Sequence, residues 1–210
     1  MIRIMIADDH AIVRQGLAKI LQISGEMEIV ASFTNGADAL NWLCDNDCDV
    51  ALVDISMPGM NGIDLLKQAR KEKPKLPVLI LSAYPEDQYA VRLIKAGAAG
   101  YLNKECAPEE VVAAVQSVLN GHRYITPAVS EMLASELSLP NGKLPHEILS
   151  NREYQIFMLL ASAQTVAEIA DTLKLSSKTV STYRSRILEK MHLLNNAQLM
   201  RYAIDNHLLQ

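Results

Sequence analysis

Acidic residues stand at the ends of apolar segments in the first half of the chain. Asp54 closes the segment ALVD, and the turn SMPGMNG follows almost at once. Asp8 and Asp9 follow the apolar segment IRIMIA. A carboxylate in such a position can cap a helix or turn, ligate a metal ion or act as a nucleophile. The rest of the sequence has to decide between these roles.

A serine and a lysine also stand at the ends of apolar segments, as the acidic residues do. Ser82 ends the apolar segment PVLILS, and Lys104 follows GYLN. In an open parallel sheet, ligands bind beyond the carboxyl ends of the strands, so all five residues would share one edge. Clustered carboxylates repel one another unless a cation neutralises them, and Mg²⁺ suits oxygen ligands. The lysine and hydroxyl then indicate a phosphoryl group. Capping explains any one of the five, but not all five together.

Short β-rich segments alternate with helical patterns over residues 1–121. The expected strands are 2–7, 28–33, 49–54, 77–82 and 100–103, and the expected helices are 10–24, 36–46, 62–72, 86–97 and 107–121. Such alternation predicts an α/β fold in which a doubly wound parallel sheet carries helices on both faces. The third and fourth strands are almost wholly apolar, as expected of strands buried on both faces.

The second half of the chain lacks a strand pattern. Residues 122–147 contain three prolines and an Asn-Gly pair, with one possible short helix near 129–137, and we interpret them as a linker. Residues 148–210 form a small all-α domain. Its four expected helices are 150–161, 165–173, 176–191 and 195–208.

Composition and charge narrow the class of protein. The 210 residues are 50% hydrophobic and 21% charged, which is ordinary for a globular protein. No apolar segment approaches the roughly 20 residues that span a bilayer. The apolar run in MIRIMIADDH is shorter than that of a secretory signal and ends in acids. We therefore expect a cytoplasmic protein with no membrane partner. The net charge is −5 over 1–121 and +2 over 148–210, and so small a basic excess is only a weak sign of nucleic-acid binding.

The three cysteines are too few and too scattered for a disulfide framework. Cys44 and Cys48 have a spacing that could suit a metal, but no second Cys/His pair accompanies them. We expect all three to be reduced packing residues, as free cysteine usually is.

The acidic, serine and lysine motifs of residues 1–121 resemble the receiver domain of bacterial two-component response regulators. The resemblance implies a (βα)5 fold with strand order 2-1-3-4-5. It also implies that Asp54 accepts a phosphoryl group from a histidine of a sensor histidine kinase. Mg²⁺ would be ligated by Asp9, Asp54 and the carbonyl of Ser56, with Asp8 acting partly through water.

Three further roles follow from this resemblance. Lys104 would pair with the phosphoryl oxygens, Ser82 would follow the phosphoryl group, and Tyr101 would turn inward with it. Gly59 and Gly62 in the turn after Asp54 would adopt dihedral angles that other residues avoid.

Two features set this chain apart from related folds. Many receivers carry a cis-proline after the lysine, whereas Glu105 stands here; a cis bond to a non-proline residue costs about 3–4 kcal/mol, and the sequence leaves cis and trans open. Phosphatases with an Asp nucleophile carry a second acid two residues later. Ser56 occupies that place, so that alternative loses its general acid.

Residues 148–208 resemble the LuxR-type helix-turn-helix, so the whole chain resembles the NarL/FixJ class of response regulators. The matching motifs are LSNRE, VAEIADTLKLSSKTVSTYRSRILEKM and NAQLMRYA. By position, the residues that read bases map to Ser181, Thr182 and Ser185. The residues that contact DNA phosphates map to Lys178, Thr179, Tyr183, Arg184, Arg186 and Lys190.

Helix physics agrees with this resemblance. Ser176 stands at an N-cap position, and Val180, Ile187 and Met191 form an apolar stripe that should face the core. Relatives usually carry glycine where this chain has Ala163, which would extend the preceding helix or adopt a left-handed turn.

The last helix carries an apolar stripe of Leu199, Tyr202 and Ala203. In this family that helix dimerises, and two-fold dimers imply symmetric sites on double-stranded DNA. A stripe of this kind can equally be core.

We therefore expect a homodimeric, non-enzymatic transcription factor controlled by phosphorylation of Asp54. Phosphorylation would either uncover the recognition helix or drive receiver dimerisation, and the sequence does not separate these. The alternative is a receiver whose helical domain binds a protein partner, which the small +2 charge favours.

Overall fold

The computed structural model describes residues 1–137 and 144–209. The chain forms two compact units, Met1–Ser135 and Glu136–Gln210. The boundary between them falls inside the segment 122–147 that the sequence assigns to a linker. Residues 138–143 of that segment lie outside the described part of the chain.

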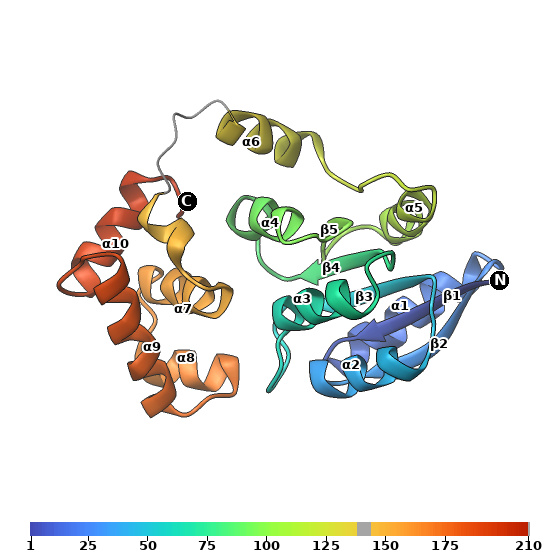
Figure 1. The fold of residues 1–210 in the computed structure, drawn as a ribbon, viewed down its shortest axis with the longest axis horizontal. Helices are drawn as coiled ribbons and strands as arrows, with labels where there is room; N and C mark the ends of the chain where they lie inside the picture. The colour runs from blue at the N-terminus through green and yellow to red at the C-terminus, as the bar shows by residue number, and fades with distance from the viewer. Residues whose placement is uncertain (138–143, 210) are drawn as a thin grey trace. The chain divides into compact units, whose positions relative to one another are not determined.

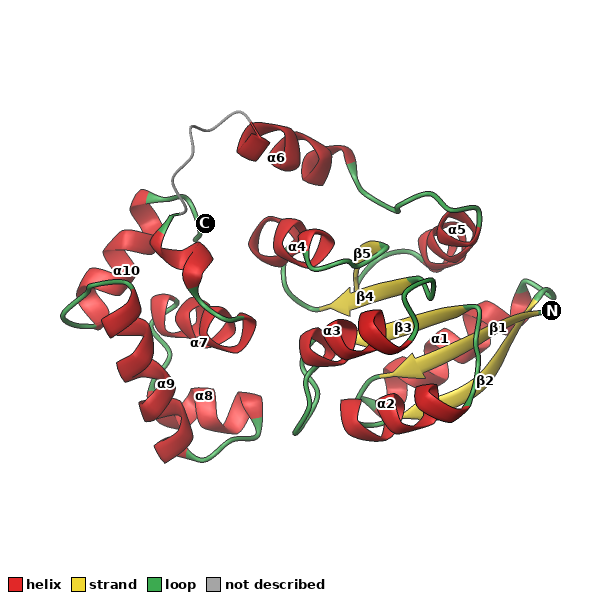
Figure 2. Cartoon of the chain, viewed as in Figure 1, coloured by secondary structure: helices red, strands yellow, loops and turns green. Residues whose placement is uncertain are grey.

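The first unit is built on a parallel sheet. Its strands are β1 (Ile2–Ala7), β2 (Met27–Phe33), β3 (Val50–Asp54), β4 (Val78–Ser82) and β5 (Gly100–Asn103). They lie in the order β2-β1-β3-β4-β5, and each neighbouring pair is parallel (Figure 2). This order is the predicted one, and it places β1, β3, β4 and β5 side by side with their carboxyl ends at one edge.

Helices cover both faces of this sheet, as predicted. They are α1 (Ala11–Ile23), α2 (Gly36–Asp45), α3 (Gly62–Glu72), α4 (Glu86–Lys95) and α5 (Pro108–Leu119). Figure 1 shows α1 and α5 on one face and α2, α3 and α4 on the other. Every residue of β3 and β4 is buried, because helices cover these central strands on both sides.

The core between the sheet and helices α1 and α5 is apolar. Its members include Ile4, Ile6, Leu52, Leu79 and Leu81 from the strands and Leu17, Leu21, Val111 and Val115 from the helices. Each fully buried side chain of this size contributes roughly 1.5–3 kcal/mol relative to an exposed one. This packing holds the strand ends rigidly in place.

The chain stays with the first unit after α5. Tyr124 forms a parallel bridge to Gly100 of β5, and α6 (Pro127–Leu137) begins two residues earlier than the short helix that the sequence predicts. The Thr126 hydroxyl accepts a hydrogen bond from the Val129 N–H (3.3 Å) and donates one to Glu86 Oε2 (2.6 Å). Because Glu86 is the first residue of α4, this contact ties the start of α6 to the start of α4.

The second unit is helical, as predicted. It contains a 3₁₀ helix (Pro145–Ile148), α7 (Asn151–Ala161), α8 (Val166–Leu173), α9 (Ser177–Lys190) and α10 (Asn196–Asp205). Helix α7 packs against α8, α9 and α10 and is buried along almost its whole length. The Ser176 hydroxyl caps α9 by accepting from the Thr179 N–H (3.0 Å), and Val180, Ile187 and Met191 are buried. The predicted cap and core stripe of α9 are confirmed.

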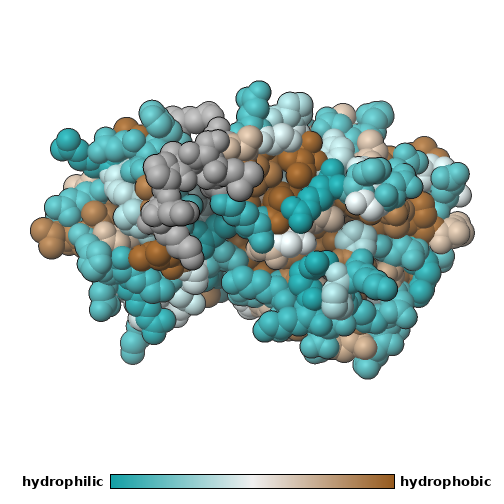
Figure 3. Space-filling view, turned by 45° about the horizontal axis from the view of Figure 1, so that its top comes forward, coloured by the Kyte–Doolittle hydropathy of each residue, from teal (hydrophilic) through white to brown (hydrophobic). Residues whose placement is uncertain are grey.

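No helix in the described ranges is long and apolar enough to cross a membrane. On the face shown in Figure 3, hydrophobic residues form patches among more numerous hydrophilic ones.

Ala163 ends the α7 region in a left-handed conformation, with φ +64°. Of the two possibilities that the sequence left open, the helix extension is therefore wrong and the left-handed turn is confirmed. An L-residue with a Cβ pays roughly 1–2 kcal/mol in this region, and glycine does not.

We therefore expect Ala163→Gly to raise the free energy of unfolding of the second unit by about 1 kcal/mol, because the strain is relieved. Urea unfolding followed by hydrogen–deuterium exchange of α7 and α8 peptides measures the change. The matched control is Ala167→Gly, an exposed position in α8, which should cost up to about 1 kcal/mol. A loss of stability in both variants would contradict the assignment of strain to Ala163.

Candidate functional site at the carboxyl edge of the sheet

The structure brings the residues predicted to act together to one edge of the sheet. Asp8 follows β1, Asp54 ends β3, Ser82 ends β4 and Lys104 follows β5. The strand register aligns Asp54 with Leu81 on β4, so Asp54 and Ser82 lie on neighbouring strands one position apart. The prediction that these strand ends converge is confirmed.

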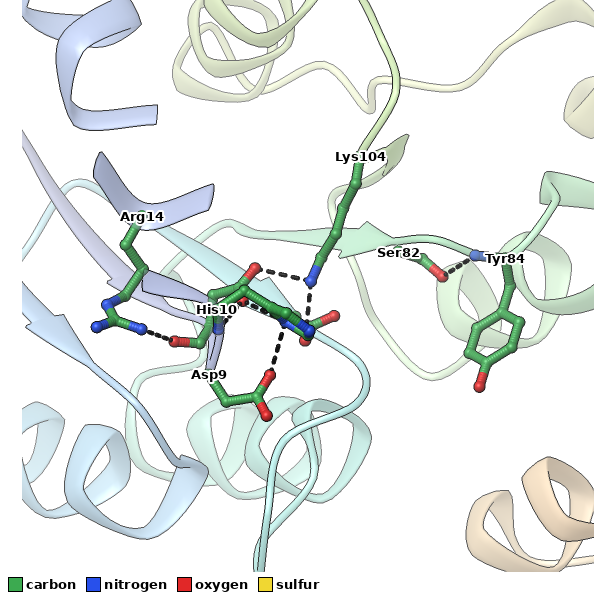
Figure 4. Close-up of polar contacts among 8 residues, drawn as sticks. Asp9, His10, Arg14, Ser82, Tyr84 and Lys104 are labelled. Atoms are coloured by element: carbon green, nitrogen blue, oxygen red, sulfur yellow. Dashed lines mark hydrogen bonds and ion pairs between the residues drawn. The ribbon is translucent and has the colours of Figure 1, made fainter. Parts of the chain in front are cut away.

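The Lys104 ammonium lies between two carboxylates. Its Nζ is 2.8 Å from Asp8 Oδ2 and 3.0 Å from Asp54 Oδ2 (Figure 4). The side chains of Asp8 and Asp54 are 0% and 2% exposed, and that of Lys104 is 12% exposed. Two buried carboxylates therefore share one largely buried cation, and each charge depends on the others for compensation.

The electrostatics of this cluster favour binding of a further cation. Burial raises the pKa of Asp54 and the Asp8 carboxylate adds to this effect, although Lys104 acts in the opposite direction. Burial alone would lower the pKa of Lys104, but Asp54 and Asp8 raise it. The cluster thus disfavours the ionised carboxylate of Asp54 and favours the protonated ammonium of Lys104.

The residues present fit a divalent cation. Ligand atoms of Asp8, Asp9, Asp54 and His10 all lie within 4.8 Å of one another. When all three carboxylates are ionised, they and the Lys104 ammonium carry a net charge of −2. One Mg²⁺ ion would neutralise this charge. The Ser56 N–H donates a hydrogen bond to Asp54, so the backbone that carries the predicted carbonyl ligand lies directly beside the carboxylate.

The turn after Asp54 folds back onto the strand. Gly59 has φ +69°, as the sequence predicts. Gly62 has no positive φ, so the predicted dihedral role is wrong for this residue. Its role is spatial, because a Cβ at Gly62 would lie 1.9 Å from the Asp54 carbonyl oxygen. Only a residue without a side chain allows the turn to approach the strand this closely.

Ser82 and Tyr101 both bind the loop that follows β4. Ser82 Oγ accepts a hydrogen bond from the Tyr84 N–H (3.0 Å), and the Tyr101 hydroxyl donates to the Tyr84 carbonyl (2.6 Å). Tyr101 is 2% exposed, so its ring points inward. Ala83 is exposed beside Ser82, and the Lys104–Glu105 peptide bond is trans.

His10 belongs to this cluster, although the sequence analysis did not single it out. Its Nδ1 lies 2.9 Å from Asp9 Oδ1 and 3.2 Å from Asp8 Oδ1. The only signal in the sequence was its position directly after the two acids. The same local structure excludes a capping role for Asp9. The N-cap residue of α1 is His10, and Asp8 accepts the His10 N–H (2.8 Å).

Helix α9 presents most of its predicted DNA-contacting residues to solvent. Lys178, Ser181, Thr182, Ser185 and Arg186 are exposed. Thr179 and Tyr183 are partly buried.

Two of the predicted phosphate contacts are held within the unit. Arg184 Nε donates to Asn196 Oδ1 (2.7 Å), and Lys190 Nζ lies 2.7 Å from Glu153 Oε2. The side chain of Glu153 is 5% exposed. Burial alone would raise the pKa of Glu153, but Lys190 and Ser150 hold it below its usual value. This pair ties α9 to the start of α7.

The apolar stripe of α10 faces the core of its own unit. Leu199 and Ala203 are 0% exposed. The Tyr202 hydroxyl lies 2.8 Å from His146 Nδ1, and its ring contacts His146 and Phe157. Leu199 and Ala203 are therefore core residues, whereas Tyr202 is partly buried. The expectation that this stripe contacts a second copy of the chain stays a prediction.

Two family models match the chain. Residues 4–116 match the response regulator receiver domain, and residues 147–203 match the LuxR family of bacterial regulatory proteins. The chain belongs to the response regulators of the NarL/FixJ class.

Similar proteins span almost the whole of this response regulator. It is 35% identical to the response regulator UvrY of Escherichia coli (strain K12) over 99% of this chain and 96% of that protein. It is 36% identical to the response regulator GacA of Pseudomonas aeruginosa over 97% and 96%. A solved structure of RcsB from Salmonella enterica serovar Typhimurium, bound to the promoter rprA in the presence of the phosphomimetic BeF₃⁻, matches with a TM-score of 0.64, 27% identity and coverage of 96% and 97%.

The raised pKa of Asp54 generates a stability prediction for this response regulator. A carboxyl group whose pKa is raised by folding destabilises the folded state as the pH rises above the ordinary aspartate pKa of about 3.9. Asp54→Asn should therefore raise the melting temperature of the receiver at pH 7 without divalent cations, and this gain should vanish towards pH 4.

Mg²⁺ provides the matching test. At ten times its Kd, it should stabilise the wild-type receiver by about 1.4 kcal/mol, and it should stabilise Asp54→Asn far less. Calorimetry with and without Mg²⁺ measures both effects, and Asp45→Asn, at an exposed position, is the control. Equal stabilisation of all three proteins would place the cation elsewhere.

Proposed function

We propose that this response regulator accepts a phosphoryl group on Asp54 from a phosphohistidine of a sensor histidine kinase and that phosphorylation controls its binding to double-stranded promoter DNA. The observation that carries the proposal is the contact of Lys104 with both Asp54 and Asp8 at the end of buried β3. This arrangement offers a carboxylate nucleophile beside a cation that can pair with the incoming phosphoryl oxygens.

The chemistry requires few groups. A carboxylate oxygen of Asp54 attacks phosphorus, the new O–P bond forms, and the N–P bond breaks as the imidazole leaves with its electron pair. Lys104 then pairs with the transferred phosphoryl oxygens. Asp8, Asp9, Asp54 and the Ser56 carbonyl would hold Mg²⁺, which would neutralise the negative charge gathered there.

The hydroxyl at the end of β4 supplies the switch. The Ser82 hydroxyl accepts from the Tyr84 N–H and can still donate its own hydrogen to a phosphoryl oxygen on Asp54, so a Ser82 side chain that turns towards this group changes its contact with the loop. The Tyr84 carbonyl accepts from Tyr101, so a moved loop alters the position that Tyr101 prefers. Phosphorylation thereby shifts the population of the β4–α4 loop, because the phosphoryl group interacts differently with its two positions.

The DNA-binding surface is the exposed side of α9. Ser181, Thr182 and Ser185 would face base edges. The Thr182 and Ser185 hydroxyls donate to backbone carbonyls of α9, which leaves their oxygens free to accept from bases. The solved RcsB structure on promoter DNA supports this assignment by family relation.

We also propose that the active form is a cytoplasmic homodimer on two-fold symmetric sites.

The test of the control step is affinity for a promoter-region DNA library with Mg²⁺ alone and with acetyl phosphate added. The donor should tighten binding of the wild type and of the control Asp45→Asn, but not of Asp54→Asn. Sequence-specific binding that ignores donor and variant would remove the switch. No DNA binding in any condition would favour a protein partner for the helical unit, as its small +2 charge allows.

Salt dependence separates the lysines of α9. Lys178→Ala should reduce the slope of log K against log salt by about 0.9, because one phosphate contact disappears. Lys190→Ala should leave that slope nearly unchanged, since Lys190 is engaged with Glu153. It should lower the stability of the unit by about 1 kcal/mol, a value discounted for the partial exposure of Lys190. Fluorescence anisotropy titrations and thermal melting measure the two quantities. The reverse pattern would show that Lys190 contacts DNA.

A further inference from the structure

We propose that His10 is an additional ligand of the divalent cation in the receiver, so that this site favours Mn²⁺ and Co²⁺ over Mg²⁺ more strongly than carboxylates alone would. The inference deepens the proposed function and rests on the same cation site. It concerns a residue to which the resemblance assigned no role.

The distances suit coordination. Adjacent ligands of an octahedral ion with bonds of about 2.1 Å lie about 3.0 Å apart. His10 Nδ1 lies 2.9 Å from Asp9 Oδ1 and 3.2 Å from Asp8 Oδ1. These two separations from His10 Nδ1 match the spacing of neighbouring ligands, although the His10–Asp8 contact is also a hydrogen bond without an ion. Figure 4 shows His10 beside Asp9.

The backbone holds the ring in this place. The His10 N–H donates to Asp8 Oδ1 (2.8 Å), and Arg14 Nη1 donates to the Asp8 carbonyl (2.6 Å). These bonds fix the turn between β1 and α1 on which His10 sits. The His10 side chain is 63% exposed, so packing does not account for its direction. Its acidic neighbours Asp8 and Asp9 have side chains that are 0% and 7% exposed, so the ring is the solvent-exposed member of this group.

Ligand chemistry then sets the preference among ions. Mg²⁺ favours oxygen ligands, whereas imidazole nitrogen suits later divalent ions, whose affinity rises from Mn²⁺ to Co²⁺. A nitrogen in the shell should therefore matter little for Mg²⁺ and more for Mn²⁺ or Co²⁺. If His10 only donates a hydrogen bond to the acids, its removal should change the affinities for all three ions alike.

The experiment uses the full chain and titrates Mg²⁺, Mn²⁺ and Co²⁺ by calorimetry. Wild type, His10→Ala, His10→Gln and His122→Ala are compared. Glutamine keeps a hydrogen-bond donor near the acids, and His122 is an exposed histidine outside the cluster. Electron spin echo spectroscopy of bound Mn²⁺ detects directly whether a ligand nitrogen is present.

We expect His10→Ala and His10→Gln to weaken Mn²⁺ and Co²⁺ binding about tenfold and Mg²⁺ binding less than about twofold. The nitrogen signal of bound Mn²⁺ should disappear in both variants and persist in His122→Ala. An equal loss for all ions, or a wild-type complex without a nitrogen signal, would overturn the proposal.

Asp54→Asn separates this proposal from the proposed function. If Asp54→Asn abolishes binding of every ion but the His10 variants show no selectivity change, the receiver site stands and only the role of His10 fails. If the wild type binds no divalent ion at all, both fail.

Discussion

The shared ion pair of Lys104 with Asp8 and Asp54 is the constraint on which the receiver depends. Buried carboxylates at 0% and 2% exposure require compensation, and one ammonium cannot neutralise both of them together with Asp9. The protein tolerates this imbalance because β1, β3 and β5 are fixed by a continuous apolar core. A rigid sheet therefore maintains an excess of negative charge that a divalent cation can neutralise. The affinity of this edge for a cation follows from the negative charge that folding brings together there.

The same edge is connected to the rest of its unit through the β4–α4 loop. Ser82 and Tyr101 hold Tyr84 from its N–H and carbonyl sides. Two residues later, Glu86 accepts a hydrogen bond from Thr126 at the start of α6. A change at Ser82 thus lies within a few residues of the segment that leads out of the receiver. Within this unit, hydrogen bonds at Tyr84 and Glu86, two residues apart on one loop, link the strand-end cluster to the outgoing chain.

In the helical unit, helix α9 has a packed inner face and an exposed outer face, and its residues differ in role accordingly. The inner face of α9 packs on α7, and Lys190 is bound by the largely buried Glu153. The outer face keeps Lys178, Ser181 and Ser185 exposed. The basic residues of this helix are therefore not equivalent, since some orient it and others remain available to a ligand. Sequence spacing assigns residues to faces, but it does not show which cations are already paired.

The architecture could be predicted from the order of residues, because apolar periodicities of two and of 3.6 residues indicate which faces of strands and helices are buried. The strand segments, their parallel arrangement and the convergence of Asp8, Asp54, Ser82 and Lys104 followed from it. Where each helix begins also followed in part from local capping, as at Ser176.

The contacts between side chains from distant parts of the chain could not be predicted in this way. Sequence spacing put His10 next to the acids along the chain but did not show its ring against them. It also did not show the approach of Gly62 to the Asp54 carbonyl, and it left open whether Leu199 lies in the core or at an interface. An apolar stripe has the same spacing whether a core or a partner covers it. The close approach of the turn to the strand depends on their distance in space, and the number of residues between them does not specify that distance. These contacts are set by packing, and packing is decided when the elements come together.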